Sequence, residues 1–171
     1  FIMNGGKSIW ILNGHTASMD SLETQSEVIV LPREGRNLDD LLFKYGVRVN
    51  FDIIQDLQAA PIPIVTHYIQ EKPQWDFFPW TFFPVISSDN THIINRNTDP
   101  VKTMFPSSID IIENAIKKTI LLKTSLMSKT TSTPALINLE NLKKEPNKKS
   151  FNENSKNIAV LLSGNFESLF N

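Results

Sequence analysis

The tripeptide GKS at residues 6–8 matches the last three positions of a phosphate-binding P-loop. Such a loop also needs a glycine at the position of Phe1, and it opens a helix whose N-terminus faces the phosphates. Instead, residues 8–12 (SIWIL) are β-branched and aromatic, which is typical of a buried strand. We therefore expect a helix end near residues 3–4, a left-handed glycine turn, and a strand of the sheet over residues 8–12, with no nucleotide site.

The other residues that could do chemistry lack the spacing of a catalytic or metal site. An α/β hydrolase places its serine in a G-x-S-x-G turn, and residues 14–18 (GHTAS) lack the second glycine. His15, His67 and His92 are not three or four residues apart, the spacing by which one helix presents two zinc ligands. The absence of cysteine excludes disulfides, thiolate ligands and cysteine nucleophiles. We identify no catalytic, cofactor-binding or metal-ligating residue and expect no enzyme; a hydrolase that assembles Ser, His and Asp on an α/β frame is the alternative.

The most unusual stretch is residues 75–84, WDFFPWTFFP, which we call the aromatic-proline segment. Its prolines exclude a regular helix and predict irregular structure or a sheet edge. We expect most of its phenylalanines to be buried, because so large an apolar area is rarely left in water: Phe77, Phe78, Phe82 and Phe83. Trp75 and Trp80 can keep their indole N–H groups near water, so they are the candidate partner-binding residues. Two interpretations stay open: the segment roofs the core, or it belongs to a module that binds a glycan, a peptide or a lipid.

Length and composition fit one domain of ordinary size, with 171 residues of which 40% are hydrophobic. The net charge of −1 lacks the basic excess of nucleic-acid-binding proteins, so we expect no nucleic-acid partner. No run approaches the roughly 20 apolar residues that span a membrane, and no signal peptide is present. The chain begins in what looks like a helix terminus and ends just after an apolar run. We therefore expect residues 1–171 to be a single domain from a longer, membrane-anchored protein, with membrane contact through segments outside this chain.

Residues 37–46 carry the clearest helix signals. Asn37 suits an N-cap, and Gly46 suits the left-handed position that ends a helix. The apolar side chains between them share one face: Leu38, Leu41, Leu42 and Tyr45. Strands are expected directly afterwards, at residues 47–49 and 52–56. A strand, a connection, a helix and a strand in this order are typical of an α/β fold with parallel pairing.

The second half of the chain predicts antiparallel structure. Residues 101–112 and 115–124 are extended and apolar, with a plausible hairpin turn between them. Short strands are expected at residues 135–139 and 158–162, and residues 143–157, rich in Lys, Asn, Glu and Ser, are expected to form a mobile loop. The predicted fold class is α/β: a mixed sheet with flanking helices and an antiparallel hairpin in the second half.

Several short stretches, in the same order and register, together resemble the gliding-motility protein family GldG of Bacteroidetes. They are NLDDLLFKYGVRVN at residues 37–50, QDLQ at 55–58, APIP at 60–63, NTDPV at 97–101, SSID at 107–110, LLKTS at 121–125 and VLLSGNFESLF at 160–170. The similarity spans nearly the whole chain.

Proteins of this family are described as auxiliary components of an ABC transporter, with an extracytoplasmic domain between membrane segments. The resemblance implies a Rossmann-like α/β domain related to the glutamine-amidotransferase-like fold, which is also seen in an intraflagellar-transport protein. An amidotransferase needs a nucleophilic cysteine, so we expect no glutaminase activity here. The resemblance thus implies a non-enzymatic auxiliary domain without a cofactor, located in the periplasm on an inner-membrane protein. Its implied partners are the permease and ATPase subunits of the transporter.

Overall fold

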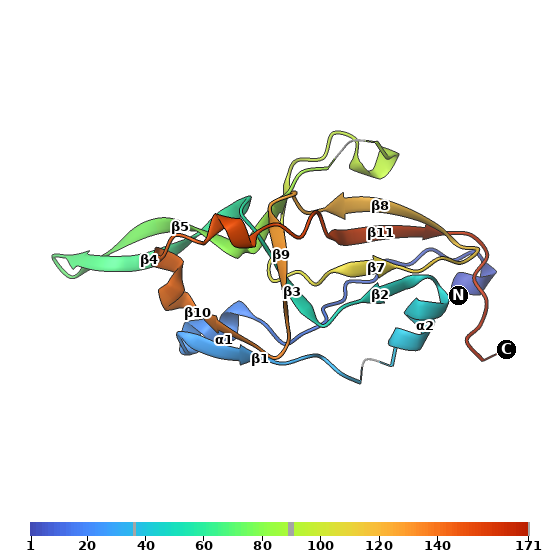
Figure 1. The fold of residues 1–171 in the computed structure, drawn as a ribbon, viewed down its shortest axis with the longest axis horizontal. Helices are drawn as coiled ribbons and strands as arrows, with labels where there is room; N and C mark the ends of the chain where they lie inside the picture. The colour runs from blue at the N-terminus through green and yellow to red at the C-terminus, as the bar shows by residue number, and fades with distance from the viewer. Residues whose placement is uncertain (36, 89–90, 171) are drawn as a thin grey trace.

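Short antiparallel strands make up most of the computed structural model, which describes residues 1–35, 37–88 and 91–170. The strands in these ranges are β1 (Glu27–Val30), β2 (Val47–Val49), β3 (Asp52–Asp56), β4 (Ala59–Ile69), β5 (Lys72–Ile86), β6 (Val101–Lys102), β7 (Ile109–Ile111), β8 (Lys117–Lys123), β9 (Ser128–Ser132), β10 (Ala135–Asn138) and β11 (Asn157–Ser163). The helical elements in the same ranges are α1 (Met19–Thr24), α2 (Asp39–Lys44) and four 3₁₀ turns, η1 (Ile2–Asn4), η2 (Ile93–Asn95), η3 (Leu139–Lys143) and η4 (Lys148–Ser150). Figure 1 shows an elongated arrangement in which β4 and β5 extend at one end.

Every strand pair in the described residues is antiparallel, so the predicted α/β fold with a parallel sheet and flanking helices is wrong. The pairs are β1 with β10, β2 with β7, β3 with β9, β8 with β11, and β5 with both β4 and β6. A parallel pair needs a crossover connection and two strands that enter one sheet in the same direction. Here β2, which follows α2, pairs with the distant β7 in the second half. Residues 8–12, the earlier strand expected from the sequence, belong to no sheet of the described residues.

Residues 8–12 carry no strand or helix, so the predicted strand of the sheet is wrong. The predicted helix end is confirmed as the 3₁₀ turn η1, which is closed by Gly5 in the left-handed conformation with φ 83°. The segment that follows is exposed at Ile9 and Ile11. The strand composition is therefore present in this segment, but no described strand lies along it.

The predicted hairpin in the second half is also wrong, because its two strands take other partners. β7 pairs with β2, and β8 pairs with β11. Asn114, in the expected turn, holds the chain differently: its Nδ2 donates to Lys44 O at 2.8 Å and its Oδ1 accepts from Ile116 N at 3.0 Å. The strands predicted at residues 47–49, 52–56, 135–139 and 158–162 are confirmed as β2, β3, β10 and β11. Part of the predicted loop over residues 143–157 forms η4, and its mobility stays a prediction.

Helix α2 is shorter than predicted but buries the predicted face. Leu42 and Tyr45 are 7% and 6% exposed, and Leu38 and Leu41 are half-buried. Gly46 takes the left-handed conformation with φ 91°, as predicted. The N-cap is Leu38 and not Asn37. Leu42 packs with Val47 and Val49 of β2 in a small second core. Among the residues that the structure describes, no helix is long and apolar enough to cross a membrane.

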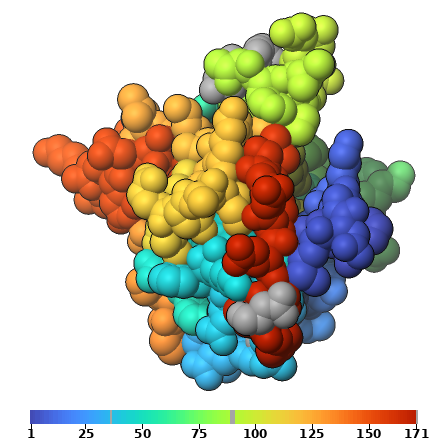
Figure 2. All heavy atoms as spheres, turned by 90° about the vertical axis from the view of Figure 1, so that its right-hand side faces the viewer, coloured from blue at the N-terminus to red at the C-terminus, as the bar shows by residue number. Residues whose placement is uncertain are grey.

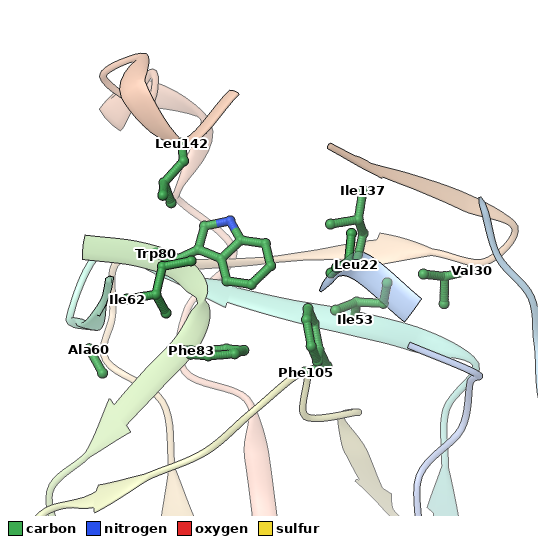
Figure 3. Packing of buried hydrophobic residues seen from close by; sticks show 10 residues of the cluster. All are labelled: Leu22, Val30, Ile53, Ala60, Ile62, Trp80, Phe83, Phe105, Ile137 and Leu142. Atoms are coloured by element: carbon green, nitrogen blue, oxygen red, sulfur yellow. The ribbon is translucent and has the colours of Figure 1, made fainter. Parts of the chain in front are cut away.

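The main core lies where the base of the β4–β5 hairpin meets the rest of the fold (Figure 3). Its buried members come from α1, β1, β3, β4, β5, β10, η3 and the loop before β7: Leu22, Val30, Ile53, Ala60, Ile62, Trp80, Phe83, Phe105, Ile137 and Leu142. Trp80 lies at its centre, with its ring centroid 4.9 Å from that of Phe83 and 5.3 Å from that of Phe105. These contacts join segments from both halves of the chain.

His15 is fully buried beside this core. Its Nδ1 accepts a hydrogen bond from Ala17 N at 3.2 Å, and its Nε2 has no hydrogen-bond partner among the described residues. Burial lowers the pKa of His15 to about 4; the charge of Arg33 acts in the same direction, and the Phe105 backbone opposes it in part. The folded protein therefore holds this ring in its neutral form.

We expect Leu42→Ala to lower the free energy of unfolding by roughly 2–5 kcal/mol, because it leaves a cavity in the second core. Chemical denaturation of the two proteins measures the difference. A loss below about 0.5 kcal/mol, the size typical of surface substitutions, would mean that this face of α2 contributes little to the fold.

His15 should also make stability depend on pH. Because the folded pKa is lowered below the ordinary value of 6.5, protonation favours the unfolded chain. This contribution is complete above pH 6.5 and is lost as the pH falls from 6.5 to about 4, by on the order of 3 kcal/mol. His15→Asn keeps an acceptor for Ala17 N and should remove this part of the pH dependence in denaturation curves. His67→Asn, at an exposed histidine, is the control that should retain it; equal slopes in all three proteins would contradict the assignment.

Candidate functional site

The candidate site is the hairpin formed by β4 and β5. Gln70 and Glu71 connect the strands, and both have positive φ, 47° and 65°. Two such residues form a type I′ turn, whose twist matches the right-handed twist of the paired strands. In Figure 1 the hairpin reaches beyond the other elements on the left-hand side. The β4–β5 ladder, whose register shifts between Ala59 and Pro61 and between Val65 and His67, therefore carries its side chains away from the body of the protein.

Cross-strand pairing gathers proline and aromatic side chains on one face of the hairpin. Trp75 lies opposite Val65, and Pro73 lies opposite Tyr68. Residues two apart on a strand share a face, and the register shift between Val65 and His67 brings Tyr68 to the same face as Val65. We call this set the apolar hairpin face: Pro61, Pro63, Val65, Tyr68, Pro73, Trp75, Phe77 and Pro79. Its aromatic residues are largely exposed, at 69% for Tyr68, 55% for Trp75 and 67% for Phe77, and no member is charged.

The opposite face of the hairpin changes from apolar to polar along its length. Near the base, Ile62 is 4% exposed and packs into the main core. Toward the turn, the Thr66 hydroxyl donates to Asp76 Oδ2 at 2.7 Å. The Thr66 hydroxyl oxygen also lies 3.0 Å from His67 Nδ1. Because the one hydroxyl proton of Thr66 is donated to Asp76, this oxygen accepts from the tautomer of His67 that carries a proton on Nδ1. The hairpin is therefore amphipathic, with the apolar face turned to solvent.

This Thr66, His67 and Asp76 group does not have the order of a nucleophilic triad. In a triad the histidine lies between the hydroxyl and the carboxylate, whereas here the hydroxyl lies between the other two. Across the described ranges, no serine hydroxyl is hydrogen-bonded to a histidine ring: the Nδ1 atoms of His15 and His92 accept from backbone amides. Nor do these ranges contain a group of three or more His, Asp or Glu that could hold a metal ion.

The prolines of the hairpin also protect its strand edges. Pro61 faces Pro79, and two residues without N–H groups cannot form a hydrogen-bonded pair. Because hydrogen-bonded and non-hydrogen-bonded pairs alternate, the pair of Pro63 with Phe77 is also non-hydrogen-bonded, and its backbone groups point to the outer edges. Prolines thus remove donors from the outer edge of both strands, which hinders the addition of another strand. The hairpin presents a face, rather than an edge, to a partner.

A hollow of about 350 Å³ lies at the base of the hairpin, between β5 and the η3 region. Its lining includes Gln55, Trp80, Thr81, Asn138, Asn141 and Leu142. The polar side chains are already engaged in part, because Thr81 Oγ1 donates to Gln55 Oε1 at 3.2 Å and Gln55 Nε2 donates to Thr131 at 2.9 Å. The Trp80 ring is only 4% exposed, so the hollow offers no open aromatic surface for stacking on a sugar.

A protein-family model described as an ABC-type uncharacterized transport system matches residues 1–171. The chain belongs to this family of transport-system auxiliary proteins. No curated protein and no solved structure matches the chain.

In this ABC-transport family member the two predicted partner-binding residues have different surroundings. Trp75 is exposed on the apolar hairpin face, where a partner contact stays a prediction. Trp80 is buried in the main core, against Phe83 and Phe105, with no surface left for a partner. The expected burial of the four phenylalanines holds fully only for Phe83, at 2% exposure; Phe78 and Phe82 are half-buried and Phe77 is exposed. Regular strand alternation turns Phe77 outward.

Sequence reasoning missed the contribution of β4 to the candidate site. Tyr68 and the two prolines at positions 61 and 63 complete the apolar hairpin face but lie outside the aromatic-proline segment. The alternation in APIPIV over residues 60–65 is a period-two pattern that predicts a strand. Edge prolines fit such a strand, and this signal could have placed β4 opposite β5.

The two tryptophans should respond differently to truncation. Trp80→Ala should lower the free energy of unfolding by roughly 3–5 kcal/mol, because it empties the centre of the core. Trp75→Ala removes an exposed ring and should change stability by about 0.5 kcal/mol or less. Chemical denaturation measures both values, and similar losses for the two variants would contradict the assigned roles.

Proposed function

We propose that this chain is a non-enzymatic, extracytoplasmic auxiliary domain of an ABC transport system, and that the apolar hairpin face binds the permease subunit. The exposed apolar hairpin face carries this proposal. Soluble monomers rarely expose large continuous apolar patches, and such patches mark sites of interaction. Membership of the transport family supplies the class of partner.

The composition of the face suits a protein contact. Tyr and Trp are enriched at interface hot spots, and Pro and two-torsion aromatic side chains lose little conformational entropy on binding. The type I′ turn and the base packed into the core fix the face before a partner arrives, which lowers the entropy lost on association. The absence of charge on the face favours a partner surface that is likewise uncharged and apolar.

The resemblance to GldG supports a periplasmic location on an inner-membrane protein and a role in gliding motility. Membrane contact would come from segments outside this chain, and the ATPase subunit would join the assembly through the permease on the other side of the membrane. Two alternatives have less support. A module that binds a glycan, a peptide or a lipid through the aromatic-proline segment would find the Trp80 ring of that segment buried beside the hollow. A hydrolase would need a nucleophile–histidine pair of the kind described for triads.

The proposal is tested with the double variant Trp75→Ala/Phe77→Ala in the full-length protein. Membranes are solubilised in mild detergent, and the amount of permease that co-purifies with the tagged protein is measured. Truncating two interface anchors should weaken association by about 2 kcal/mol or more, which corresponds to roughly 30-fold. Stability should be nearly unchanged, because both side chains are exposed.

The matched control is Phe43→Ala, which removes a 56% exposed ring from α2, away from the hairpin. This variant should co-purify with the permease as the unchanged protein does. Equal recovery of permease with the hairpin variant and the control would refute the hairpin contact. Loss of recovery with both variants would point to a general effect of exposed aromatic residues.

A further inference from the structure

Residues 8–12 form a segment with an unpaired backbone. No amide or carbonyl group of residues 7–12 is hydrogen-bonded to another residue within the described ranges. The one hydrogen bond inside the segment joins side chains, from Trp10 Nε1 to Ser8 Oγ at 2.7 Å. A row of free N–H and C=O groups along an extended chain is what a strand offers to a sheet.

The side chains of residues 8–11 are exposed, and Leu12 at the end of the segment is partly covered. Leu12 is half-buried and packs against the second core of Leu42, Val47 and Val49. Ile9 and Ile11 are 92% and 94% exposed, whereas Trp10 between them is 36% exposed. Burying an isoleucine contributes roughly 1.5–3 kcal/mol, so this face gains from a cover. Figure 2 shows the N-terminal residues in blue at the margin of this side of the molecule.

The segment is held in place at its C-terminal end. At its start, the hydrogen bonds of η1 and Gly6 stay within residues 1–6. At its end, Gly14 N donates to Ser107 Oγ at 3.0 Å, and Gly14 sits so close to Asn50 O that a Cβ atom would overlap it. The next residue, His15, forms a β-bridge with Pro32. Anchoring at this end reduces the entropy that the segment loses when it pairs.

We propose that residues 8–12 add as a strand to the open edge of an apolar β-sheet presented within the assembled transport system. A strand edge satisfies both observations: it supplies partners for the free backbone groups, and apolar side chains of the neighbouring strand pack beside Ile9 and Ile11 on the same face of the sheet. A helix or a lipid surface would cover the isoleucines and leave the backbone groups unpaired. The contrast with the hairpin supports this choice, because prolines block the edges of β4 and β5, and residues 8–12 contain no proline and no charge.

The first test is photo-crosslinking in native membranes, with p-benzoylphenylalanine at position 9 or position 11 of the full-length protein. We expect crosslinks to one extended segment, identified by mass spectrometry, with the site of attachment shifting by two residues between the two positions. Position 93 is the control, since Ile93 is also exposed, at 75%, but lies in η2. Crosslinks to lipid, to a helix, or at no higher yield than at position 93 would overturn the proposal.

The second test is residue-resolved hydrogen exchange of the assembly purified from membranes, compared with the isolated chain. Pairing along one edge protects alternate amides, so within residues 8–12 we expect protection to alternate between slowed and unchanged positions, by about 100-fold at the slowed ones. Ile11→Lys should reduce this protection, and Ile93→Lys should not. Uniform protection would indicate an apolar contact without strand addition, and equal exchange in the two samples would indicate no contact; either result contradicts the proposal. The hairpin variants leave this segment intact, so failure here is distinct from failure of the hairpin contact.

Discussion

The packing of Trp80 against Phe83 and Phe105 is the contact on which the candidate site depends. A two-stranded hairpin is marginal in water by itself, and it becomes rigid when its base is packed into a core. The Trp80 ring is centred within 5.3 Å of both phenylalanine rings, and Ile62 brings β4 into the same cluster. This contact joins β5 to the segment before β7 and so ties the hairpin to the second half of the chain. The outer part of the hairpin can then carry exposed rings without losing its shape.

The same alternation that exposes Phe77 and Trp75 decides where the backbone of the hairpin points. In an antiparallel ladder, the residues of one face belong to one class of cross-strand pair. The facing prolines Pro61 and Pro79 assign the apolar face to the non-hydrogen-bonded class. One set of residues therefore supplies the surface for a partner and blocks strand addition at the edges. A face rich in proline serves both purposes at once, which a face of valines would not.

Local elements could be predicted from the sequence, and their partners could not. The strands β2, β3, β10 and β11 follow from short apolar runs, and Gly46 ends α2 because a left-handed residue is needed there. The pairing of β2 with β7 has no local signal, since nothing in the residues of β2 indicates which distant strand it meets. Helix α2 suggested an α/β fold, but at six residues it is too short to cover a sheet. For the candidate site, composition singled out the aromatic-proline segment, and only the register of β4 and β5 separates exposed Trp75 from buried Trp80.

The wide separation of paired strands along the chain has a consequence for the order of folding. Glu27 pairs with Asn138, and Asp52 pairs with Ser132, so these ladders close only once the chain has been synthesised as far as the later partner. Topologies of this kind fold slowly, because a long loop must be closed before its contacts stabilise anything. The β4–β5 hairpin is the local exception, with a two-residue connection. This hairpin can form early, and its aromatic rings are then exposed to other unfolded chains while the long-range ladders close. The prolines at its edges hinder strand addition, so aggregation through the hairpin is limited to contacts between faces.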